Sequence, residues 1–591
     1  MLQNFDEKNQ KDNIPERLKH LRELMKSNSL DGFIIPRADF FQSEYVAECD
    51  ERLAWLTGFT GSAGFACVLK QNSAVFVDGR YRIQVKLQVI DKFEIVHWPE
   101  TTLTQWIAKN ITSGTIGFDA DLHTEHEIDE LRKTLNSSKI LFSPVENLID
   151  IIWIDQPLKP KEPIFKHPLK FAGKSSKEKC IQISTLLKIS NQKNCVLTDP
   201  ESIAWLLNIR GADVPHVPVA HSKAIISDLA KVDLFIDPIK LEKFSSKGLE
   251  HTTFWKPQSF NLHLENLNGI TRVDPKKTPL SVVALLKKPM FSDDPCLLLK
   301  AMKNKVEISG AKKAHKRDAT AMVEFLCWLD AQTPGMFTEI ETVEKLEDLR
   351  RGIKYFKDIS FETIAGSGAN GAMAHYRVTS SSNRSVENGD LLLVDSGGQY
   401  LDGTTDITRT IPIGNVSKEK KHFFTRVLKG MIAISTLRFP SGTSGRDIDA
   451  IARIPLWEIG QDYNHGTGHG VGSYLSVHEG PQRISKASAT PLAEGMIISN
   501  EPGFYLENNF GIRIENLLIV KKSLPKSKYI GKEMLEFETI SLVPIDKRLI
   551  IKKLLDAKEI KWINSYHKKI RTEVRVEGQA LNWLRKATSP L

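Results

Sequence analysis

The sequence predicts three domains, of which the first two are α/β and the third is α+β with a helical tail. Its length of 591 residues exceeds what one hydrophobic core supports. A helix-then-strand pattern occurs twice before residue 300, whereas strands and glycine-rich turns dominate beyond residue 340. We therefore expect domains at 1–160, 161–303 and 304–591, with a C-terminal extension from about 545.

The first domain opens on an amphipathic helix. Apolar residues recur at helical spacing within 14–32, so one face of this segment can be buried. The apolar run FIIP (33–36) then predicts a short buried strand. The stretch AVFVDGRYRIQ (74–84) predicts another strand, with Asp78 and the following glycine as a turn.

The second domain repeats this order. Residues 177–194 have helical spacing, and the apolar run CVLT (195–198) predicts a strand. The tripeptide Ala-Trp-Leu occurs at 54–56 and again at 204–206, which indicates a weak internal repeat. The stretch 156–177 is rich in lysine and proline and is typical of a linker.

The third domain carries the residues that could do chemistry. It begins with a long helix-like segment at 297–332, and its tail from about 545 returns to helical spacing. Most histidines and acid-rich motifs lie between them, at 370–515. We therefore expect the functional site in the last domain.

The composition excludes several classes of function. Hydrophobic content of 41% and charged content of 26% are ordinary for a globular protein, and the net charge of +9 is mild, so nothing indicates nucleic-acid binding. Six scattered cysteines without a CxxC pair predict reduced thiols. The polar N-terminus and the lack of a run of about 18 apolar residues predict a cytoplasmic protein that binds no membrane.

The motif GSGANG (366–371) matches the glycine spacing of a dinucleotide-binding loop. Such a loop needs a helix directly after it, because the phosphate binds at the helix N-terminus. The residues that follow are rich in Ser, Asn and β-branched side chains, which disfavour a helix. We expect a flexible loop here.

Three aspartates lie close together in VDSGGQYLDGTTDITRT (394–410): Asp395, Asp402 and Asp406. The apolar run LLLV predicts a strand that ends at Asp395, and TTDITRTI (404–411) alternates with Asp406 and three threonines on one face. If these strands pair around GGQYLDG, Asp395 and Asp406 lie opposite each other, with Cβ atoms about 4.5–5.5 Å apart. Asp402 then falls in the turn, where aspartate is usually structural.

Two carboxylates this close repel by about 1 kcal/mol in water and about 4 kcal/mol at an effective dielectric of 20. A shared proton or a bound cation would relieve this repulsion. Two further acids come from strand-like segments: Glu501 in ISNEPGFY (498–505) and Glu515 in NFGIRIENLLIV (509–520). Both remedies remain open, but the number of acids favours a cation.

Three histidines, His465, His469 and His478, follow in the glycine-rich stretch 464–481. The spacing lacks the glutamate of HExxH, and the glycines favour a loop that closely approaches a buried site. Four carboxylates would balance two divalent cations, and oxygen ligands with one imidazole suit Mn²⁺, with Zn²⁺ or Co²⁺ as alternatives. Two ions about 3.5–4 Å apart can share and activate a hydroxide.

The order of these motifs resembles that of the pita-bread metallopeptidases, which include methionine aminopeptidase, prolidase and aminopeptidase P. The ligand series Asp, Asp, His, Glu, Glu of that family matches Asp395, Asp406, His469, Glu501 and Glu515. Over residues 14–570 the chain is similar to the three-domain aminopeptidase P form. Its DERLAWLTGFTGSAG (50–64), SIAWLLNIRGADVPHVPV (202–219) and HGTGHGVGSYLSVHEGP segments carry this similarity. Asn464 departs from the glycine expected there, at a position that is not a ligand.

The resemblance implies two tandem creatinase-N-like domains followed by a pita-bread catalytic domain. It also implies removal of the N-terminal residue from peptides with proline second, two divalent ions and a homodimer. Asp395 would bind one ion, and His469 would bind on the same side of the site as Glu501. Asp406 and Glu515 would bridge, or nearly bridge, the two ions. A hydroxide shared by the ions would attack the scissile carbonyl.

The resemblance also assigns roles outside the ligand set. Glu501 is the expected proton acceptor, and His375, His465 and His478 are expected to bind substrate or stabilise the tetrahedral intermediate. Arg80 of the first domain is a further candidate for substrate binding, with a structural role as its alternative.

Three other functions compete with this assignment. A prolidase would share the ligands but cleave only X–Pro dipeptides, and it is usually shorter, with one N-terminal domain of this type. A non-catalytic binding protein on the same fold would lose ligand residues, and a metal-free creatinase-like hydrolase would replace the acids. All five ligand residues are present in this sequence, which disfavours the last two.

Overall fold

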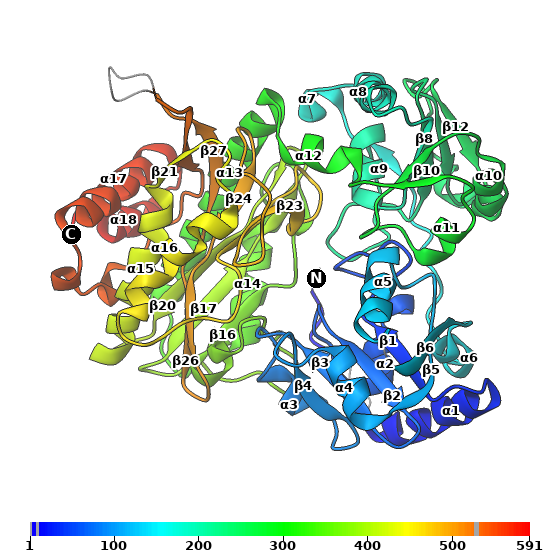
Figure 1. The fold of residues 1–591 in the computed structure, drawn as a ribbon. Helices are drawn as coiled ribbons and strands as arrows, with labels where there is room; N and C mark the ends of the chain where they lie inside the picture. Colours follow the sequence, from blue (N-terminus) through cyan, green and yellow to red (C-terminus); the bar gives the residue numbers. More distant parts are fainter. Residues whose placement is uncertain (1–2, 7–10, 137, 525–530) are drawn as a thin grey trace. The chain divides into compact units, whose positions relative to one another are not determined.

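The computed structural model describes residues 3–6, 11–136, 138–524 and 531–591 (Figure 1). The chain forms two compact units. The N-terminal unit comprises Glu7–Leu169 and Lys174–Leu297. The C-terminal unit comprises Leu298–Leu591 together with Met1–Asp6 and Lys170–Gly173.

The N-terminal unit contains two six-stranded sheets. The strands of the first sheet are β1 (Gly32–Pro36), β2 (Phe65–Leu69), β3 (Ser73–Val77), β4 (Glu94–His97), β5 (Ser113–Phe118) and β6 (Lys139–Pro144). The strands of the second sheet are β8 (Asn194–Leu197), β10 (Lys223–Ser227), β11 (Val232–Phe235), β12 (Thr252–Trp255), β13 (Thr271–Val273) and β14 (Pro289–Phe291). A separate pair is formed by β7 (Phe165–Lys166) and β9 (Ile209–Arg210).

Helices connect these strands. Those of the first half are α1 (Ile14–Ser27), α2 (Arg52–Thr57), α3 (Gln84–Gln88), α4 (Leu103–Asn110), α5 (Glu125–Thr134) and α6 (Leu148–Ile152). Those of the second half are α8 (Ser176–Ile189), α9 (Pro200–Leu207), α10 (Phe260–Asn266) and α11 (Leu280–Ala284). The helices α7 (Leu169–Ala172) and α12 (Pro295–Ala301) each span a boundary between the two units.

The two sheets have the same topology, which confirms the tandem repeat. Their strand orders are β4-β3-β2-β1-β5-β6 and β12-β11-β10-β8-β13-β14. In each sheet the first strand pairs antiparallel with the second and parallel with the fifth. The repeated Ala-Trp-Leu tripeptides lie in α2 and α9, the helices that follow β1 and β8.

Two expectations for this unit were wrong in extent. The strand expected over 74–84 covers only Ser73–Val77. The expected turn at Asp78 is present, and its Oδ1 accepts from the backbone N–H of Arg80 at 2.9 Å, but the next element after it is α3 and not a continued strand. The stretch 156–177 is more than a linker, since it contributes β7 and α7. Lysine and proline content alone therefore misjudged a segment that pairs with β9.

The described part of the C-terminal unit combines long helices with one six-stranded sheet, two three-stranded sheets and a two-stranded pair. Its helices are α13 (Lys305–Asp330), α14 (Glu339–Arg351), α15 (Lys418–Ser435), α16 (Gly445–Trp457), α17 (Ala557–Glu573) and α18 (Gly578–Ala587). Its strands up to residue 440 are β15 (Phe356–Ile359), β16 (Ile364–Ser367), β17 (Leu391–Ser396), β18 (Gly398–Tyr400), β19 (Gly403–Thr404), β20 (Ile407–Pro412) and β21 (Arg438–Pro440). The later strands are β22 (Gly468–Gly470), β23 (Glu479–Ile484), β24 (Ile497–Asn500), β25 (Gly503–Leu506), β26 (Phe510–Arg513), β27 (Asn516–Lys522) and β28 (Met534–Thr539).

The strand β17 is buried on both faces, which explains its unbroken apolar run. Leu391 packs in the core cluster formed by α15, α17 and β26. Leu392 and Val394 pack in a different cluster with α13 and α14. A strand covered on both sides has no face that needs polar residues. Figure 1 shows α15, α16, α17 and α18 gathered on one side of this unit's strands.

The long helix expected over 297–332 is divided in two. Asn304 caps α13, because its side chain accepts from the backbone N–H groups of Val306 and Glu307 at 2.9 and 3.2 Å. The Glu307 carboxylate in turn accepts a hydrogen bond from the backbone N–H of Asn304 at 2.9 Å, which completes a capping box. The helical tail is confirmed as α17 and α18.

The GSGANG stretch is not the flexible loop that we expected. It continues β16 into a short 3₁₀ helix, η5 (Gly368–Ala372), with buried glycines. Gly371 packs so closely on Gly511 that a Cβ at Gly511 would lie 1.7 Å from the carbonyl oxygen of Gly371. The glycines therefore serve close packing, and the helix start of a dinucleotide site does not form here.

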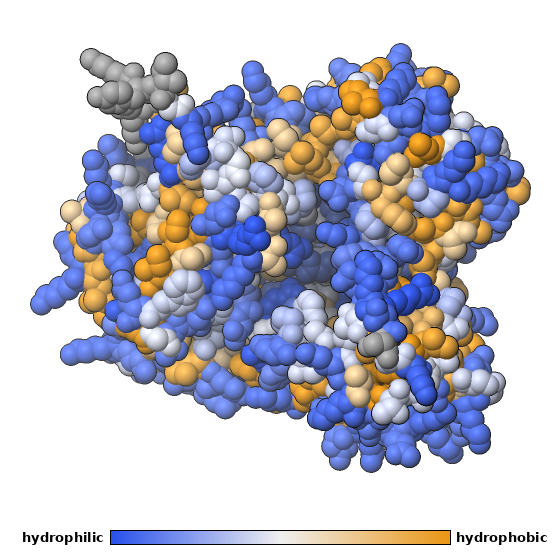
Figure 2. All heavy atoms as spheres, viewed as in Figure 1, coloured by the Kyte–Doolittle hydropathy of each residue, from blue (hydrophilic) through white to orange (hydrophobic). Residues whose placement is uncertain are grey.

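The face of the molecule in Figure 2 carries mostly hydrophilic side chains, with hydrophobic ones scattered among them. Single exposed apolar side chains are normal on protein surfaces. Within the part of the chain that the structure describes, no helix is both long and apolar enough to cross a bilayer.

Candidate metal centre

The five predicted ligands lie at the ends or interruptions of strands in the C-terminal unit. Asp395 is the penultimate residue of β17, and Asp406 directly precedes β20. His469 is the middle residue of β22, next to a register shift. Glu501 directly follows β24, and Glu515 lies between β26 and β27. Asp406, Glu501 and Glu515 lie outside the strands, whereas Asp395 and His469 lie in ladders next to a strand end and a register shift. The side chains can therefore turn toward a common point.

The expected pairing of Asp395 with Asp406 was wrong. In the antiparallel pair β17/β20, Asp395 lies opposite Thr408, and Asp406 lies two residues away, outside the ladder. The segment between the strands is not a simple turn, because β18 and β19 pair with each other and β18 pairs with β15. This second sheet shifts the register of the predicted hairpin.

The third aspartate of this segment is where the sequence placed it. Asp402 lies in the turn between β18 and β19 and forms an ion pair with Arg317 of α13. Its side chain is only 5% exposed. Asp402 thus connects a turn to a helix.

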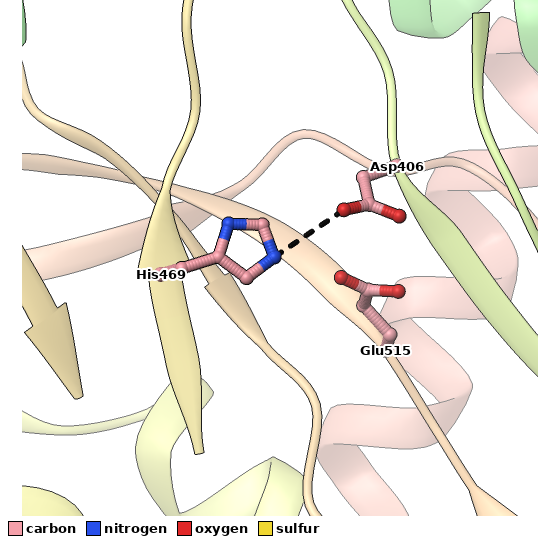
Figure 3. Close-up of side chains that lie close together, drawn as sticks. All are labelled: Asp406, His469 and Glu515. Atoms are coloured by element: carbon pink, nitrogen blue, oxygen red, sulfur yellow. Dashed lines mark ion pairs between the residues drawn. The ribbon is translucent and has the colours of Figure 1, made fainter. Parts of the chain in front are cut away.

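Asp406, His469 and Glu515 form the centre of the cluster. Each offers one ligand atom, and these atoms lie within 4.8 Å of one another (Figure 3). The Nε2 atom of His469 lies 3.4 Å from Oδ2 of Asp406 and 3.3 Å from Oε1 of Glu501. Figure 3 shows the imidazole ring directed at the carboxylates of Asp406 and Glu515.

Asp395 joins the cluster beside an arginine that we did not single out from the sequence. The Nη2 atom of Arg513 lies 2.7 Å from Oδ2 of Asp395. Arg513 also donates to the Thr408 hydroxyl at 3.2 Å and to the Tyr505 hydroxyl at 2.6 Å. Its place two residues before Glu515, on the same face of the alternating segment, was a signal for this role.

Burial and mutual repulsion disturb the titration of these acids. Desolvation, followed by the negative charges of Asp395 and Glu501, raises the pKa of Asp406 well above its usual range. Desolvation, followed by the charge of Asp406, likewise raises the pKa of Glu515. Ionised carboxylates in this interior therefore require a compensating positive charge.

The donor set fits divalent cations. Oδ1 of Asp395 and Oε1 of Glu515 are buried, and neither has a hydrogen-bond partner among the residues described. Nδ1 of His469 lies 2.9 Å from the carbonyl oxygen of Gly470, which can only accept, so Nδ1 carries the proton. Nε2 then presents a lone pair to the carboxylate oxygens, an arrangement that a metal ion would stabilise.

Ser499 orients two of these groups together. Its Oγ atom accepts from the backbone N–H of His469 at 2.9 Å and donates to Oε1 of Glu501 at 3.0 Å. Ser499 lies in β24, two residues before Glu501, and the strand ends between them at Asn500. The short motif ISNE therefore supplies both a candidate ligand and the hydroxyl that holds it.

The other predicted histidines lie in three places. Nε2 of His465 lies 2.9 Å from the hydroxyl of Tyr505, the same hydroxyl that accepts from Arg513. The His478 ring lies edge-on to the His469 ring, with centroids 4.3 Å apart. His375 lies in the turn after η5, partly exposed.

Arg80 has contacts within the N-terminal unit. Its Nη2 atom lies 2.7 Å from Oδ2 of Asp78, and its Nη1 atom lies 3.8 Å from Oε1 of Glu44. These contacts are those of the structural alternative that the sequence left open.

Models of known protein families match the chain in the predicted order. The model of the creatinase/prolidase N-terminal domain matches residues 155–307, and a second model of that description matches 17–152. The model of metallopeptidase family M24 matches 309–522, and that of the C-terminal region of peptidase M24 matches 533–591. The predicted fold class, with creatinase-type domains before a pita-bread domain, is confirmed.

The chain is similar over 98% of its length to proteins from fungi and a nematode. It is 38% identical to a probable Xaa-Pro aminopeptidase P of Laccaria bicolor, over 98% of this chain and 94% of the relative. It is 37% identical to the protein of that name in Paracoccidioides brasiliensis (strain Pb03), over 98% and 99%.

A solved structure agrees with these relatives. The X-prolyl aminopeptidase of Caenorhabditis elegans, described as a cytosolic enzyme with a di-nuclear active site, is 31% identical. It matches 98% of this chain and 100% of its own, with a TM-score of 0.93. At such identity over nearly the whole length, this chain belongs to the metallopeptidase family M24, among the Xaa-Pro aminopeptidase P proteins.

Proposed function

We propose that this chain is a metal-dependent aminopeptidase that releases the N-terminal residue from peptides with proline at the second position. The observation that carries the proposal is the buried group of Asp406, His469 and Glu515, whose ligand atoms lie within 4.8 Å of one another. Its relatives are named for this activity, and the C. elegans protein is described as di-nuclear. A match across both N-terminal domains supports this activity over that of the prolidase alternative.

We assign two divalent cations to the ligands Asp395, Asp406, His469, Glu501 and Glu515. Mn²⁺ suits this oxygen-rich set with one imidazole, and Zn²⁺ or Co²⁺ are the alternatives. When bound, such a pair lowers the pKa of a shared water and polarises the scissile carbonyl. Asp406 and Glu515 are the most deeply buried carboxylates of this set and lie at the centre of the group, so they would help to hold both ions.

Glu501 is assigned as the proton acceptor. Its side chain is 17% exposed, compared with 4% for Asp406, so it can exchange a proton with substrate and solvent. Ser499 holds its Oε1 atom, and His469 lies beside it at 3.3 Å. The position of Glu501 just outside β24 suits a group that moves a proton while its neighbours stay fixed.

The histidines His375, His465 and His478 are assigned to substrate binding or to the tetrahedral intermediate. Because an arginine N–H can only donate, the Tyr505 hydroxyl accepts from Arg513 and can donate to Nε2 of His465. His465 is thereby linked through Tyr505 to the arginine that holds Asp395. The T-shaped contact between the rings of His478 and His469, with centroids 4.3 Å apart, supports the assignment of His478.

The preference for proline has a chemical basis. An X–Pro bond is a tertiary amide without an N–H, so an enzyme that must hydrogen-bond that N–H would fail. The test compares the peptide Arg-Pro-Pro with the dipeptide Ala-Pro, using enzyme loaded with Mn²⁺. We expect release of Arg from the longer peptide, with Asp406→Asn as the inactive control. Cleavage of the dipeptide alone would instead identify a prolidase.

The remaining assignments follow the family. We propose a cytoplasmic homodimer with domains at 1–160, 161–303 and 304–591, a division that the matched ranges 17–152, 155–307 and 309–522 support. The C. elegans relative is described as cytosolic. Light scattering coupled to gel filtration measures the oligomeric state, and a mass of one chain, 66.6 kDa, would contradict the dimer.

A further inference from the structure

Arg409 is a buried cation that donates to no carboxylate among the residues that the structure describes. It lies in β20, next to Thr408, and is 2% exposed. Its guanidinium donates to six acceptors, which are the carbonyl oxygens of Pro544, Thr408, Glu515 and Val543, the Asn516 side chain and the Tyr566 hydroxyl. Desolvation lowers the pKa of Arg409. Burying a charged group costs desolvation free energy, so a buried arginine of this kind indicates a structural role.

The place of Glu515 supplies that reason. Glu515 lies in the gap between β26 and β27, so neither strand's ladder holds its backbone. Its N–H donates to the carbonyl of Thr408 at 3.2 Å, and its own carbonyl accepts from Nη1 of Arg409 at 2.6 Å. The same Nη1 atom donates to the Thr408 carbonyl at 2.8 Å. Arg409 therefore links the backbone of Glu515 to that of Thr408 through hydrogen bonds to both carbonyl oxygens.

Thr408 completes this connection on the side-chain side. Its hydroxyl donates to Oε2 of Glu515 at 2.9 Å. Any movement of Arg409 would shift the Glu515 backbone relative to the hydroxyl that orients its carboxylate. The guanidinium thus acts on a proposed metal ligand without touching its carboxylate.

The C-terminal extension holds Arg409 in turn. Tyr566 of α17 accepts from Nη2 of Arg409 at 2.9 Å, across 157 residues of sequence. The hydroxyl also lies 2.9 Å from the carbonyl of Val543 and 3.2 Å from Oδ1 of Asn516, and it can donate to either. The Tyr566 ring is 5% exposed and stacks on Trp562 at 5.1 Å, so its position is fixed by packing.

We propose that the C-terminal extension is part of the metal centre: Tyr566 holds Arg409, and Arg409 positions Glu515 for metal binding. The inference rests on the proposed function, because Glu515 matters only where the site binds metal. Arg409 and Tyr566 are positioning residues, since they act through Glu515. In this arrangement α17 does more than cover the core of the unit.

The test replaces Tyr566 with phenylalanine, which removes one hydroxyl and keeps the ring. The readouts are the Mn²⁺ dissociation constant of the metal-free protein, titrated by electron paramagnetic resonance, and the visible spectrum of the Co²⁺-loaded protein. Loss of a group that supports a ligand typically weakens metal binding about 10- to 100-fold, and we expect the lower end for Tyr566→Phe because it acts through Arg409. The Co²⁺ spectrum should change with it.

The matched control is Lys569→Met. Lys569 lies one turn further along α17 and donates to the carbonyl of Thr539 at 2.9 Å, a contact that does not lead to Arg409. This variant should keep Mn²⁺ affinity within about twofold and leave the Co²⁺ spectrum unchanged. Arg409→Lys is a second test variant that keeps the charge but cannot reach both carbonyls, and it should bind Mn²⁺ more weakly than Tyr566→Phe.

Two results are decisive against the proposal. If Tyr566→Phe unfolds at lower urea but binds Mn²⁺ with wild-type affinity and an unchanged Co²⁺ spectrum, the extension is only structural. If the folded wild-type protein binds neither Mn²⁺ nor Co²⁺, the proposed function itself is wrong, and this inference falls with it. Wild-type binding therefore separates the two failures.

Discussion

Thr408 donates its hydroxyl hydrogen bond to Oε2 of Glu515 at 2.9 Å, across 107 residues of sequence. Thr408 also lies opposite Asp395 in the ladder between β17 and β20, and its hydroxyl accepts from Nε of Arg513 at 3.2 Å. Thr408 thus contacts the proposed ligand Glu515 directly, and it contacts Arg513, which forms an ion pair with the proposed ligand Asp395. The relative positions of Asp395 and Glu515 depend on this side chain.

Replacing Thr408 with valine should weaken metal binding. The change keeps the side-chain shape and removes the donor to Oε2 of Glu515, whose Oε1 already lacks a partner among the described residues. We expect the Mn²⁺ dissociation constant to rise about tenfold, as for other groups that orient ligands. Thr342→Val is the control, because Thr342 is buried in α14 and its hydroxyl donates to the carbonyl of the N-cap residue Thr338 at 2.9 Å, away from the proposed ligands. Equal Mn²⁺ affinity in both variants would contradict the role of Thr408.

The metal-free protein should lose stability as the pH rises, through Asp406 and Glu515. Burial, then neighbouring carboxylates, raises the pKa of Asp406 above its unfolded value, which is about 3.9. The folded state therefore binds this proton more tightly. The resulting stability is fully present below the unfolded pKa and is lost as the pH rises through the raised folded pKa.

This pH effect can be isolated with Asp406→Asn, which cannot ionise. Urea unfolding of the metal-free proteins should be measured at a series of pH values. The unfolding free energy of the variant, relative to that of the wild type, should increase as the pH increases. Saturating Mn²⁺ should restore the unfolding free energy of the wild type at high pH, because the ions bind only the native state. Parallel stability curves for the two metal-free proteins would show that Asp406 carries no buried charge.

His478→Gln should slow turnover while keeping both metal ions. The His478 ring lies 4.3 Å from that of His469, and we assign it to the intermediate rather than to the ligand set. Removing one group that stabilises an oxyanion costs about 10²–10³ in kcat. The control is His20→Gln, an exposed histidine of α1. Metal analysis after dialysis checks the assignment, and loss of an ion in His478→Gln would make His478 a ligand.

Much of the site could be predicted because its residues lie in short, characteristic segments. The run LLLV predicted β17, since a strand buried on both faces is apolar throughout, although the strand ends at Ser396, one residue beyond the expected Asp395. The glycines around His469 predicted a loop that approaches the site closely and argued against a helix; residues 468–470 form no helix, but His469 lies in the short strand β22 and not in a loop. These features depend on neighbours in sequence.

The features that could not be predicted depend on distant partners. The register of Asp395 with Thr408 is set by β15, which pairs with β18 inside the predicted turn. The alternating pattern puts Arg513 on the same face as Glu515, but its ion-pair partner Asp395 lies 118 residues earlier in the chain, so the pairing itself has no local signal. The division of the alternating segment 509–520 into β26 and β27, with Glu515 between them, likewise has no local signal.

Asp402→Ala should reduce stability without affecting the chemistry. The Asp402 carboxylate is 5% exposed and pairs with Arg317, whose side chain is 23% exposed. Losing a hydrogen bond between charged groups costs about 1.5–3 kcal/mol of unfolding free energy. With saturating Mn²⁺, kcat/KM should stay within about twofold of wild type, because Asp402 lies in the turn and outside the proposed ligand set.

The two partners of this ion pair should not be equivalent. Removing Asp402 leaves Arg317 able to reach water, whereas Arg317→Ala leaves a carboxylate buried without its counter-charge. Arg317→Ala should therefore lower the unfolding free energy more than Asp402→Ala does. A double-mutant cycle in urea measures the coupling between the two residues. Loss of Mn²⁺ binding in Asp402→Ala would instead assign the third aspartate to the metal site.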